Sequence, residues 1–202
     1  MIDMMILACA AVVAITDRTR IAVVAAVIIA GITGGAAVTA GHGSGLSPIL
    51  SFAVAGMTAL IAPLGILYFV RVHPVAGDLR PSVGVGMRVA IVAADLFIAR
   101  GTIGLASFRT EPELLPDAFL LLCALTALMV HRNLLGQIVG LLVLGSAVEY
   151  AGDVLLPTLP GIVRTAFAFD AVIVTFIALL LVHAFRTHYP LLDVSSLRRL
   201  RG

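Results

Sequence analysis

Apolar runs, all but the short first one close to the length needed to cross a bilayer, occupy most of this chain and leave only short loops between them. A transmembrane helix needs about 20 mainly apolar residues. Charged residues make up only 12% of the chain and hydrophobic residues 61%, whereas soluble domains carry roughly a quarter of charged residues. The chain lacks the charges needed for a water-facing surface, so we expect lipid to cover most of it.

Seven such runs are present, and we interpret each as a membrane-spanning helix. They cover Ile2–Ile15, Ile21–Thr39, Leu46–Val70, Val83–Leu105, Leu114–Val130, Leu134–Leu155 and Gly161–Phe185. The sequence thus predicts an all-α integral membrane protein, a bundle of about seven transmembrane helices forming a single polytopic membrane domain over residues 1–202. No loop is long enough to fold as a catalytic domain. The first run does not resemble a signal peptide, because its first charged residue is the acidic Asp3.

The arginines indicate how the bundle is oriented. If seven helices alternate in direction, one side holds ten of the thirteen basic residues, all of them arginine, and the other side holds only Arg109 and Arg164. Arg100 belongs to the fourth run. Because cytoplasmic loops of membrane proteins are enriched in arginine and lysine, we predict the N-terminus outside and the C-terminus in the cytoplasm. The expected location is the cell (inner) membrane of a bacterium or archaeon.

Asp170 stands near the middle of the seventh run. An ionised side chain at that depth costs roughly 3 kcal/mol by insertion scales, and such residues normally face protein or water. We predict that Asp170 takes part in a proton relay. The alternative is a neutral acid that forms a structural hydrogen bond between helices.

The fourth run carries Arg88, Asp95 and Arg100. Arg88 and Asp95 are two helical turns apart and share a face, whereas Asp95 and Arg100 diverge by about 140° around the axis. Arg88 and Arg100 are therefore candidate charge partners, and Asp95 is a candidate relay acid. A structural ion pair within the bundle is equally compatible with the pattern.

Glu149 and Asp153 lie four residues apart in the sixth run and stack on one helix face. Two neighbouring acids raise the pKa of the less solvated one. Because Asp153 lies near the end of the run, we expect Glu149 to be the deeper group. It is a candidate for the relay or for a buried hydrogen bond.

Two glycine pairs have the spacing that permits close helix packing, Gly31 with Gly35 and Gly136 with Gly140. The spacing is common in apolar helices, so it predicts bundling and nothing more specific.

The sequence contains no recognisable ligand set for a cofactor. Cys9 and Cys123 are isolated in apolar runs, and the five histidines show no metal-binding spacing. Nucleotide-binding loops, nucleophile elbows and zinc-protease motifs are missing as well. The net charge of +2 is too small to indicate nucleic acid. We therefore predict no catalytic residue, no cofactor, no metal and no nucleic-acid partner.

Three segments in the last third resemble a known family. The sequence HRNLLGQIVGL at His131–Leu141 resembles the start of the second helix of the K subunit of complex I-type NADH:quinone oxidoreductases. It is similar also to component E of membrane-bound hydrogenases of the formate hydrogenlyase type. AFDAVI at Ala168–Ile173 is similar to that component's acid-bearing last helix, and RTHYPLLDVSSL at Arg186–Leu197 resembles its ending. The resemblance covers residues 120–202, a K-subunit-like three-helix portion.

The resemblance implies a non-catalytic subunit in the membrane arm of a hydrogenase or complex I-like oxidoreductase. Its partners would be antiporter-like subunits and the membrane subunit that docks the hydrogenase or quinone module. Buried acids would contribute to proton or sodium translocation. Only Asp170 matches a family acid. Leu142 stands where K subunits carry glutamate, and Gly145-Ser146 stands where component E carries a glutamate–asparagine pair.

Two other functions fit the composition. One is a stand-alone small membrane transporter or channel, which predicts several polar groups converging on a pocket. The other is a purely structural membrane anchor, in which the acids Asp170, Glu149 and Asp95 are replaceable without loss of function.

Overall fold

The structure is a computed structural model that describes residues 2–40, 56, 61–72, 81–105, 114–155 and 161–188. Seven helices account for nearly all of the described residues, with one isolated bridge, Pro81 with His131, outside them. They are α1 (Ile2–Ile15), α2 (Thr19–Ala40), α4 (Ala62–Val72), α5 (Val85–Leu105), α6 (Leu114–Val130), α7 (Leu134–Leu155) and α8 (Gly161–His188).

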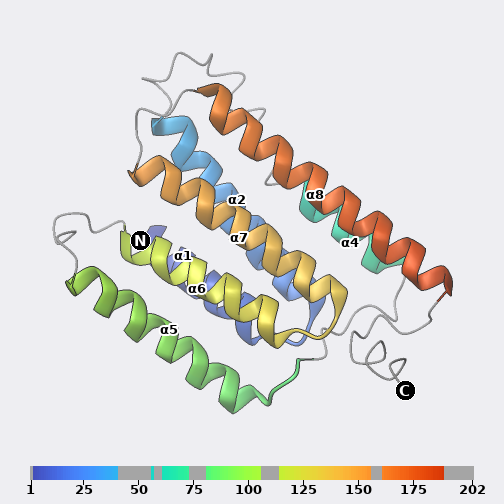
Figure 1. Ribbon diagram of the computed structural model, residues 1–202, viewed down its shortest axis with the longest axis horizontal. Helices are drawn as coiled ribbons and strands as arrows, with labels where there is room; N and C mark the ends of the chain where they lie inside the picture. The colour runs from blue at the N-terminus through green and yellow to red at the C-terminus, as the bar shows by residue number, and fades with distance from the viewer. Residues whose placement is uncertain are drawn as a thin grey trace.

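The helices lie side by side with their axes nearly aligned (Figure 1). The turn at residues 16–18 joins α1 to α2, and the turn at residues 131–133 joins α6 to α7. Such short connections force neighbouring helices to run antiparallel. Figure 1 places α5 at one edge of the bundle and α8 at the opposite edge, with α6 and α7 between them.

The helix α1 lies at the centre of the packing although it has only 14 residues. It contacts α2, α5, α6 and α7. Its buried residues, Ile6, Ala10, Val13 and Ala14, follow the spacing of one helix face and are 1% exposed or less. The small alanines let the neighbouring helices approach closely. The helix α4 instead packs on α2 and α8, away from this centre.

The α6–α7 hairpin is the most extensive helix pair, and its own sequence explains the close fit. The side-chain oxygen of Asn133 accepts a hydrogen bond from the Leu135 backbone N–H at 3.1 Å, which caps the start of α7. A Cβ atom at Gly136 would lie 2.6 Å from the His131 side chain, and one at Gly140 would lie 3.0 Å from Leu128. A Cβ at position 136 would therefore force the α6–α7 turn to shift, and one at position 140 would crowd Leu128 on α6.

The described residues confirm the predicted all-α fold, and their helix bounds agree closely with the apolar runs. The predicted run Leu46–Val70 is described only in part, because residues 46–60, apart from Gly56, lie outside the described residues. Of the two predicted glycine pairs, only Gly136 and Gly140 make close contacts. Side chains added at Gly31 and Gly35 would meet nothing within 4 Å.

One described helical stretch, Leu134–Gly152, is long and apolar enough to cross a membrane. Four shorter apolar stretches of 10–17 residues accompany it: Ile2–Ile15, Thr19–Gly35, Leu114–Val130 and Val172–Leu181. The seven membrane crossings and their orientation stay a prediction.

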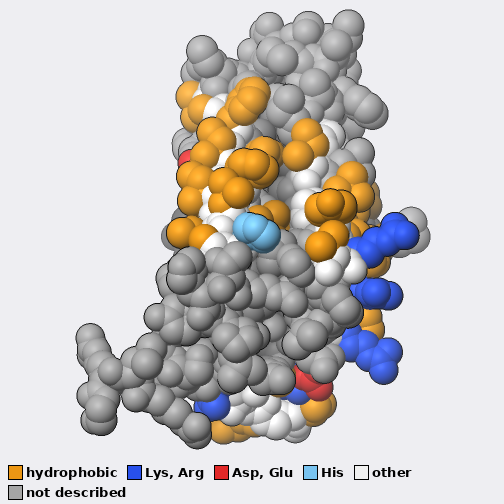
Figure 2. Space-filling model, turned by 90° about the vertical axis from the view of Figure 1, so that its right-hand side faces the viewer, with side chains coloured by type: hydrophobic (Ala, Val, Ile, Leu, Met, Phe, Trp, Pro, Cys, Tyr) orange, Lys and Arg blue, Asp and Glu red, His pale blue; other side chains and the backbone are white. Residues whose placement is uncertain are grey.

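Large hydrophobic side chains are exposed on every described helix. The most exposed are Met129 at 83%, Phe97 at 80% and Tyr68 at 72%. Figure 2 shows one face on which hydrophobic side chains cover much of the described surface and arginine side chains lie along an edge. Soluble monomers rarely expose apolar patches of this extent. We therefore expect an apolar environment or a partner protein to cover this surface.

Candidate functional site

One end of the bundle gathers basic residues and is here called the arginine-rich end. It is the end where α1 and α6 finish and α2, α5 and α7 begin. Arg18, Arg20, Arg88 and Arg132 lie at or next to these helix ends. Three of them are exposed, whereas Arg88 is 1% exposed and is the largest fully buried side chain described.

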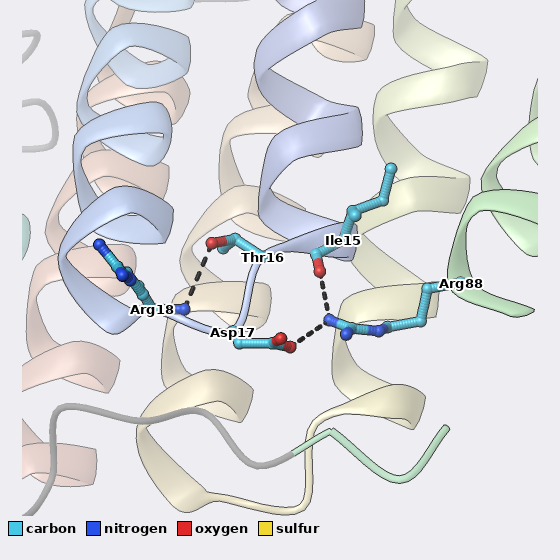
Figure 3. Close-up of polar contacts among 5 residues, drawn as sticks. All are labelled: Ile15, Thr16, Asp17, Arg18 and Arg88. Atoms are coloured by element: carbon cyan, nitrogen blue, oxygen red, sulfur yellow. Dashed lines mark hydrogen bonds and ion pairs between the residues drawn. The ribbon is translucent and has the colours of Figure 1, made fainter. Parts of the chain in front are cut away.

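Arg88 joins α5 to the turn between α1 and α2 (Figure 3). Its Nη1 atom forms an ion pair with the Asp17 carboxylate at 2.6 Å and donates a hydrogen bond to the backbone carbonyl of Ile15. That carbonyl lies at the C-terminus of α1, where carbonyls lack partners within the helix and attract cations. The same turn is closed by the Thr16 hydroxyl, which accepts a hydrogen bond from the Arg18 N–H at 3.3 Å.

His131 belongs to the same group of residues, here called the Arg88 cluster: Asp17, Arg88 and His131. It is 2% exposed, and its two ring nitrogens have no hydrogen-bond partner among the described residues. Burial lowers the pKa of His131 to about 4, with a further lowering by the Arg88 charge and an opposing effect of Asp17. His131 is therefore neutral near pH 7, and it packs against Gly136.

Backbone contacts bring a third segment to this cluster. The Ser82 N–H donates a hydrogen bond of 2.7 Å to the Val130 carbonyl, and Pro81 forms an isolated antiparallel bridge with His131. The residues just before α5 are thereby joined to the α6–α7 turn. The Arg88 cluster connects three chain segments that are far apart in the sequence.

Asp95 is buried in the middle of α5. Its hydrogen-bond partner is neither of the two candidate basic residues, Arg88 and Arg100. The hydroxyl of Thr126 on α6 donates a hydrogen bond of 2.7 Å to its carboxylate. Asp95 is 7% exposed and Thr126 is 8% exposed. The candidate charge partner Arg88 pairs with Asp17 instead, so the shared helix face does not produce an Arg88–Asp95 pair.

Asp170 and Arg100 point away from the bundle. Asp170 on α8 is exposed, and so is Arg100 on α5. Neither forms an ion pair or hydrogen bond with another described residue. Both belong to predominantly apolar helices, which makes their outward position unusual. In a lipid environment an unpartnered charge at such a position is costly.

Glu149 is partly buried on α7, and Leu142, at the position of the family's glutamate, packs in the hydrophobic core at 6% exposure. Ser146 stands at another position where this chain departs from the family. Its hydroxyl donates a hydrogen bond of 3.3 Å to the Leu142 carbonyl. The side chain of Asp153 lies outside the described residues. In this part of α7, Leu142 therefore packs in the core and Ser146 bonds to the backbone of its own helix, and neither residue supplies an ionisable group.

The three predicted relay acids do not form one cluster. Asp95 and Asp170 lie on α5 and α8, at opposite edges of the bundle, and Glu149 lies on α7 between those edges (Figure 1). A relay through them stays a prediction. Asp17, Thr126 and Asp117 are not among the site residues predicted from the sequence. Asp117, in the first turn of α6, is buried, and its Oδ1 atom has no partner among the described residues.

Metal binding has no support in the part of the chain that the structure describes, where no three histidine, cysteine or acidic side chains lie together. Comparison with protein-family models, curated proteins and solved structures finds no match to this chain. The functional assignment therefore depends on the residues and their arrangement.

Proposed function

We propose that this chain is a multi-pass membrane subunit of a larger assembly of the hydrogenase or complex I type. In that role it anchors partner subunits and contributes acids to proton or sodium translocation. The proposal draws on the three family-like segments, of which the last, Arg186–Leu197, lies outside the described residues beyond His188.

A membrane setting accounts for the surface. Large hydrophobic side chains are exposed on all the described helices, whereas the exposed arginines Arg18, Arg20 and Arg132 gather at one end. Lipid tails would cover the apolar sides, and the arginine-rich end would face the cytoplasm. This arrangement is unfavourable for a protein surrounded by water.

The outward position of Asp170 is the observation that carries the subunit function. A stand-alone transporter directs its ionisable groups toward an internal path, but Asp170 lies on the exposed face of α8. The neighbouring Ile173 and Ile177 are 53% and 51% exposed. A partner that covers this face would shield the carboxyl group from lipid and could exchange protons with it.

A purely structural anchor is the second candidate, and one observation favours it. The HRNLLG segment has direct packing functions, since Asn133 caps α7 and Gly136 makes room for His131. These functions explain the motif without ion translocation. The two candidates differ in whether the titratable proton of Asp170 matters.

The test is ion translocation and redox turnover in membrane vesicles that contain the native assembly. We expect Asp170→Asn to assemble and to retain most redox turnover, while translocation falls by at least roughly tenfold, as for loss of a proton-transfer group. Glu149→Gln should have a smaller effect. Asp170→Glu is the matched control, because it keeps the titratable proton and should keep translocation.

Each alternative has its own outcome. Normal translocation in Asp170→Asn would leave the anchor as the function. Recovery of the tagged chain from native membranes without other membrane subunits would instead contradict the subunit function and favour a stand-alone transporter.

A further inference from the structure

The helix α5 forms one edge of the bundle and attaches to it by a single stripe. Its buried side chains are Arg88, Val92, Asp95 and Ala99, spaced by three or four residues. The opposite side of the helix is open and carries Phe97 and Arg100 among the small residues Gly86, Ala90, Ala93, Ala94 and Gly101. Side chains added at Gly86 or Gly101 would meet nothing within 4 Å. Another helix could approach this face closely.

The helix α8 forms the opposite edge and is open in a similar way. Its exposed face carries Asp170 together with Phe169, Ile173, Phe176, Ile177, Leu180 and Leu181. Asp170, Ile173 and Ile177 follow one another at three- and four-residue intervals and therefore share a stripe. Each edge of the bundle thus presents an apolar helix face with one exposed charge, negative on α8 and positive on α5.

The two charges lie in the same half of the bundle. Both are in the half of their helix that lies away from the arginine-rich end. At 1.5 Å per residue, Arg100 is about 8 Å from the last residue of α5 and Asp170 about 14 Å from the first residue of α8. The long, flexible arginine side chain can bridge such a difference.

We propose that these faces bind each other between two copies of the chain, with α5 of one copy against α8 of the next and Arg100 paired with Asp170. Two copies with the same orientation bring α5 and α8 together antiparallel, since the two helices run in opposite directions (Figure 1). The contact removes both charges from lipid. It depends only on the membrane setting of the proposed function.

The charges also select the symmetry of this contact. A twofold dimer through α8 places Asp170 against its own copy, and one through α5 places Arg100 against its own copy, so like charges meet. A head-to-tail contact pairs opposite charges. Repetition of that contact gives a row or a closed ring of subunits.

Cysteine cross-linking tests the contact while keeping both charges. In antiparallel packing with Arg100 opposite Asp170, Phe97 lies opposite Ile173. Single Phe97→Cys and Ile173→Cys variants are made in a chain whose Cys9 and Cys123 are replaced by alanine, and are oxidised in vesicles. We expect a cross-linked dimer when the two variants are mixed and almost none from either variant alone. A dimer from Ile173→Cys alone, or none from the mixture, would overturn the proposal.

Charge exchange tests the ion pair itself. Adding Arg100→Asp to the Phe97→Cys chain should lower the yield of the mixed dimer by roughly tenfold or more. Adding Asp170→Arg to the Ile173→Cys chain as well should restore it. Arg132→Gln, which removes an exposed charge elsewhere, is the control and should change nothing. If the exchanged pair fails to restore the yield, the ion pair is wrong.

The cross-linking result can be separated from the result for the proposed function. A chain that co-purifies with other membrane subunits but gives no mixed dimer has only the head-to-tail contact disproved. A mixed dimer from a chain that lacks other partners supports the contact and contradicts the hydrogenase-type assembly.

Discussion

Among the described residues, Arg88 in the Arg88 cluster has partners for its charge, whereas the charged side chains on the two open edges, α5 and α8, do not. Within the cluster, Arg88 has a carboxylate and a carbonyl as partners, both supplied by the same chain. At the edges, Arg100 and Asp170 are exposed and unpaired among the described residues. In the sequence, Arg88 and Arg100 look alike, since both are arginines in the same apolar run. Their surroundings differ: Arg88 is buried and stabilises the folded chain, whereas Arg100 is exposed and available to a partner.

We therefore expect substitutions in these two regions to have different effects. Replacing Arg88 should lower the free energy of unfolding, because it leaves the Asp17 carboxylate and the Ile15 carbonyl without their partner. Changes at Arg100 and Asp170 should leave the free energy of unfolding nearly unchanged and act on association.

Replacing Arg88 with alanine should have the largest effect. It removes a buried side chain and leaves the Ile15 carbonyl and the Asp17 carboxylate without their partner. We expect a loss of about 3 kcal/mol in the free energy of unfolding, at the lower end for broken buried ion pairs because Asp17 is half exposed. Reversible unfolding in mixed micelles measures it. The exposed Arg18→Ala is the control, and an equal loss in both variants would contradict the special role of Arg88.

Acidification should weaken the same cluster through His131. Its pKa is about 4 in the folded chain, against about 6.5 when unfolded. Between these values the unfolded chain binds a proton that the folded chain does not. The free energy of unfolding should therefore fall as the pH falls from about 6.5 to about 4, by about 3 kcal/mol in total. A His131→Gln variant should lack this contribution, so an identical pH dependence in both proteins would refute it.

Gly136→Ala should cost about 1–2 kcal/mol, because the added Cβ meets the His131 side chain at 2.6 Å. The matched control is Gly35→Ala, which has the same glycine spacing in α2 but open space around it. That substitution should be neutral or stabilising by up to about 1 kcal/mol. In a His131→Gly background, which removes the His131 Cβ as well as the ring, the cost at Gly136 should largely disappear, and a persistent cost would show that the clash is not its cause.

Thr126→Val should cost about 1–2 kcal/mol, since it removes the donor that satisfies the buried Asp95 carboxylate. The shape of the side chain is nearly unchanged, so unfolding measurements report mainly on the hydrogen bond. Combining it with Asp95→Leu should give less than the sum of the two single effects. Simple additivity would mean that the two side chains act independently.

Arg100→Gln and Asp170→Asn should change the free energy of unfolding of the dispersed monomer by less than about 0.5 kcal/mol, as is usual for exposed sites. Size-exclusion chromatography and the cross-linking assay should show reduced association between copies of this chain in the same variants, without loss of binding to other subunits. A loss of stability as large as that of Arg88→Ala would remove the contrast between the cluster and the edges.

The helices were predictable from the sequence because the apolar runs are long and bounded by charged, proline-rich or glycine-rich loops. The Arg88–Asp17 pair was not. Asp17 stands in the segment TDRTR, which looks like an ordinary solvated turn, and its partner comes from a helix far along the chain. The burial of His131 likewise depends on the space left by Gly136, which only the fold reveals.

The direction of Asp170 was unpredictable for a different reason. Periodicity shows which side of a helix is buried only when the other side is polar. The part of α8 around Asp170 is apolar on every side, so its sequence does not distinguish the face that packs on α7 from the face that is exposed. The sequence identified Asp170 as a candidate functional acid, but it did not show which residues lie beside it in the folded chain.

The central place of α1 has a consequence for biosynthesis. The helix α1 leaves the ribosome before α5, α6 and α7, which later pack on it. Until those helices have been translated, α1 lacks three of the four described helices that contact it, and the C-terminal carbonyl of Ile15 lacks its Arg88 donor. Much of the packing around α1 must therefore form only after α5, α6 and α7 have been synthesised. A translation product interrupted before α6 would expose unfinished packing surfaces to membrane proteases.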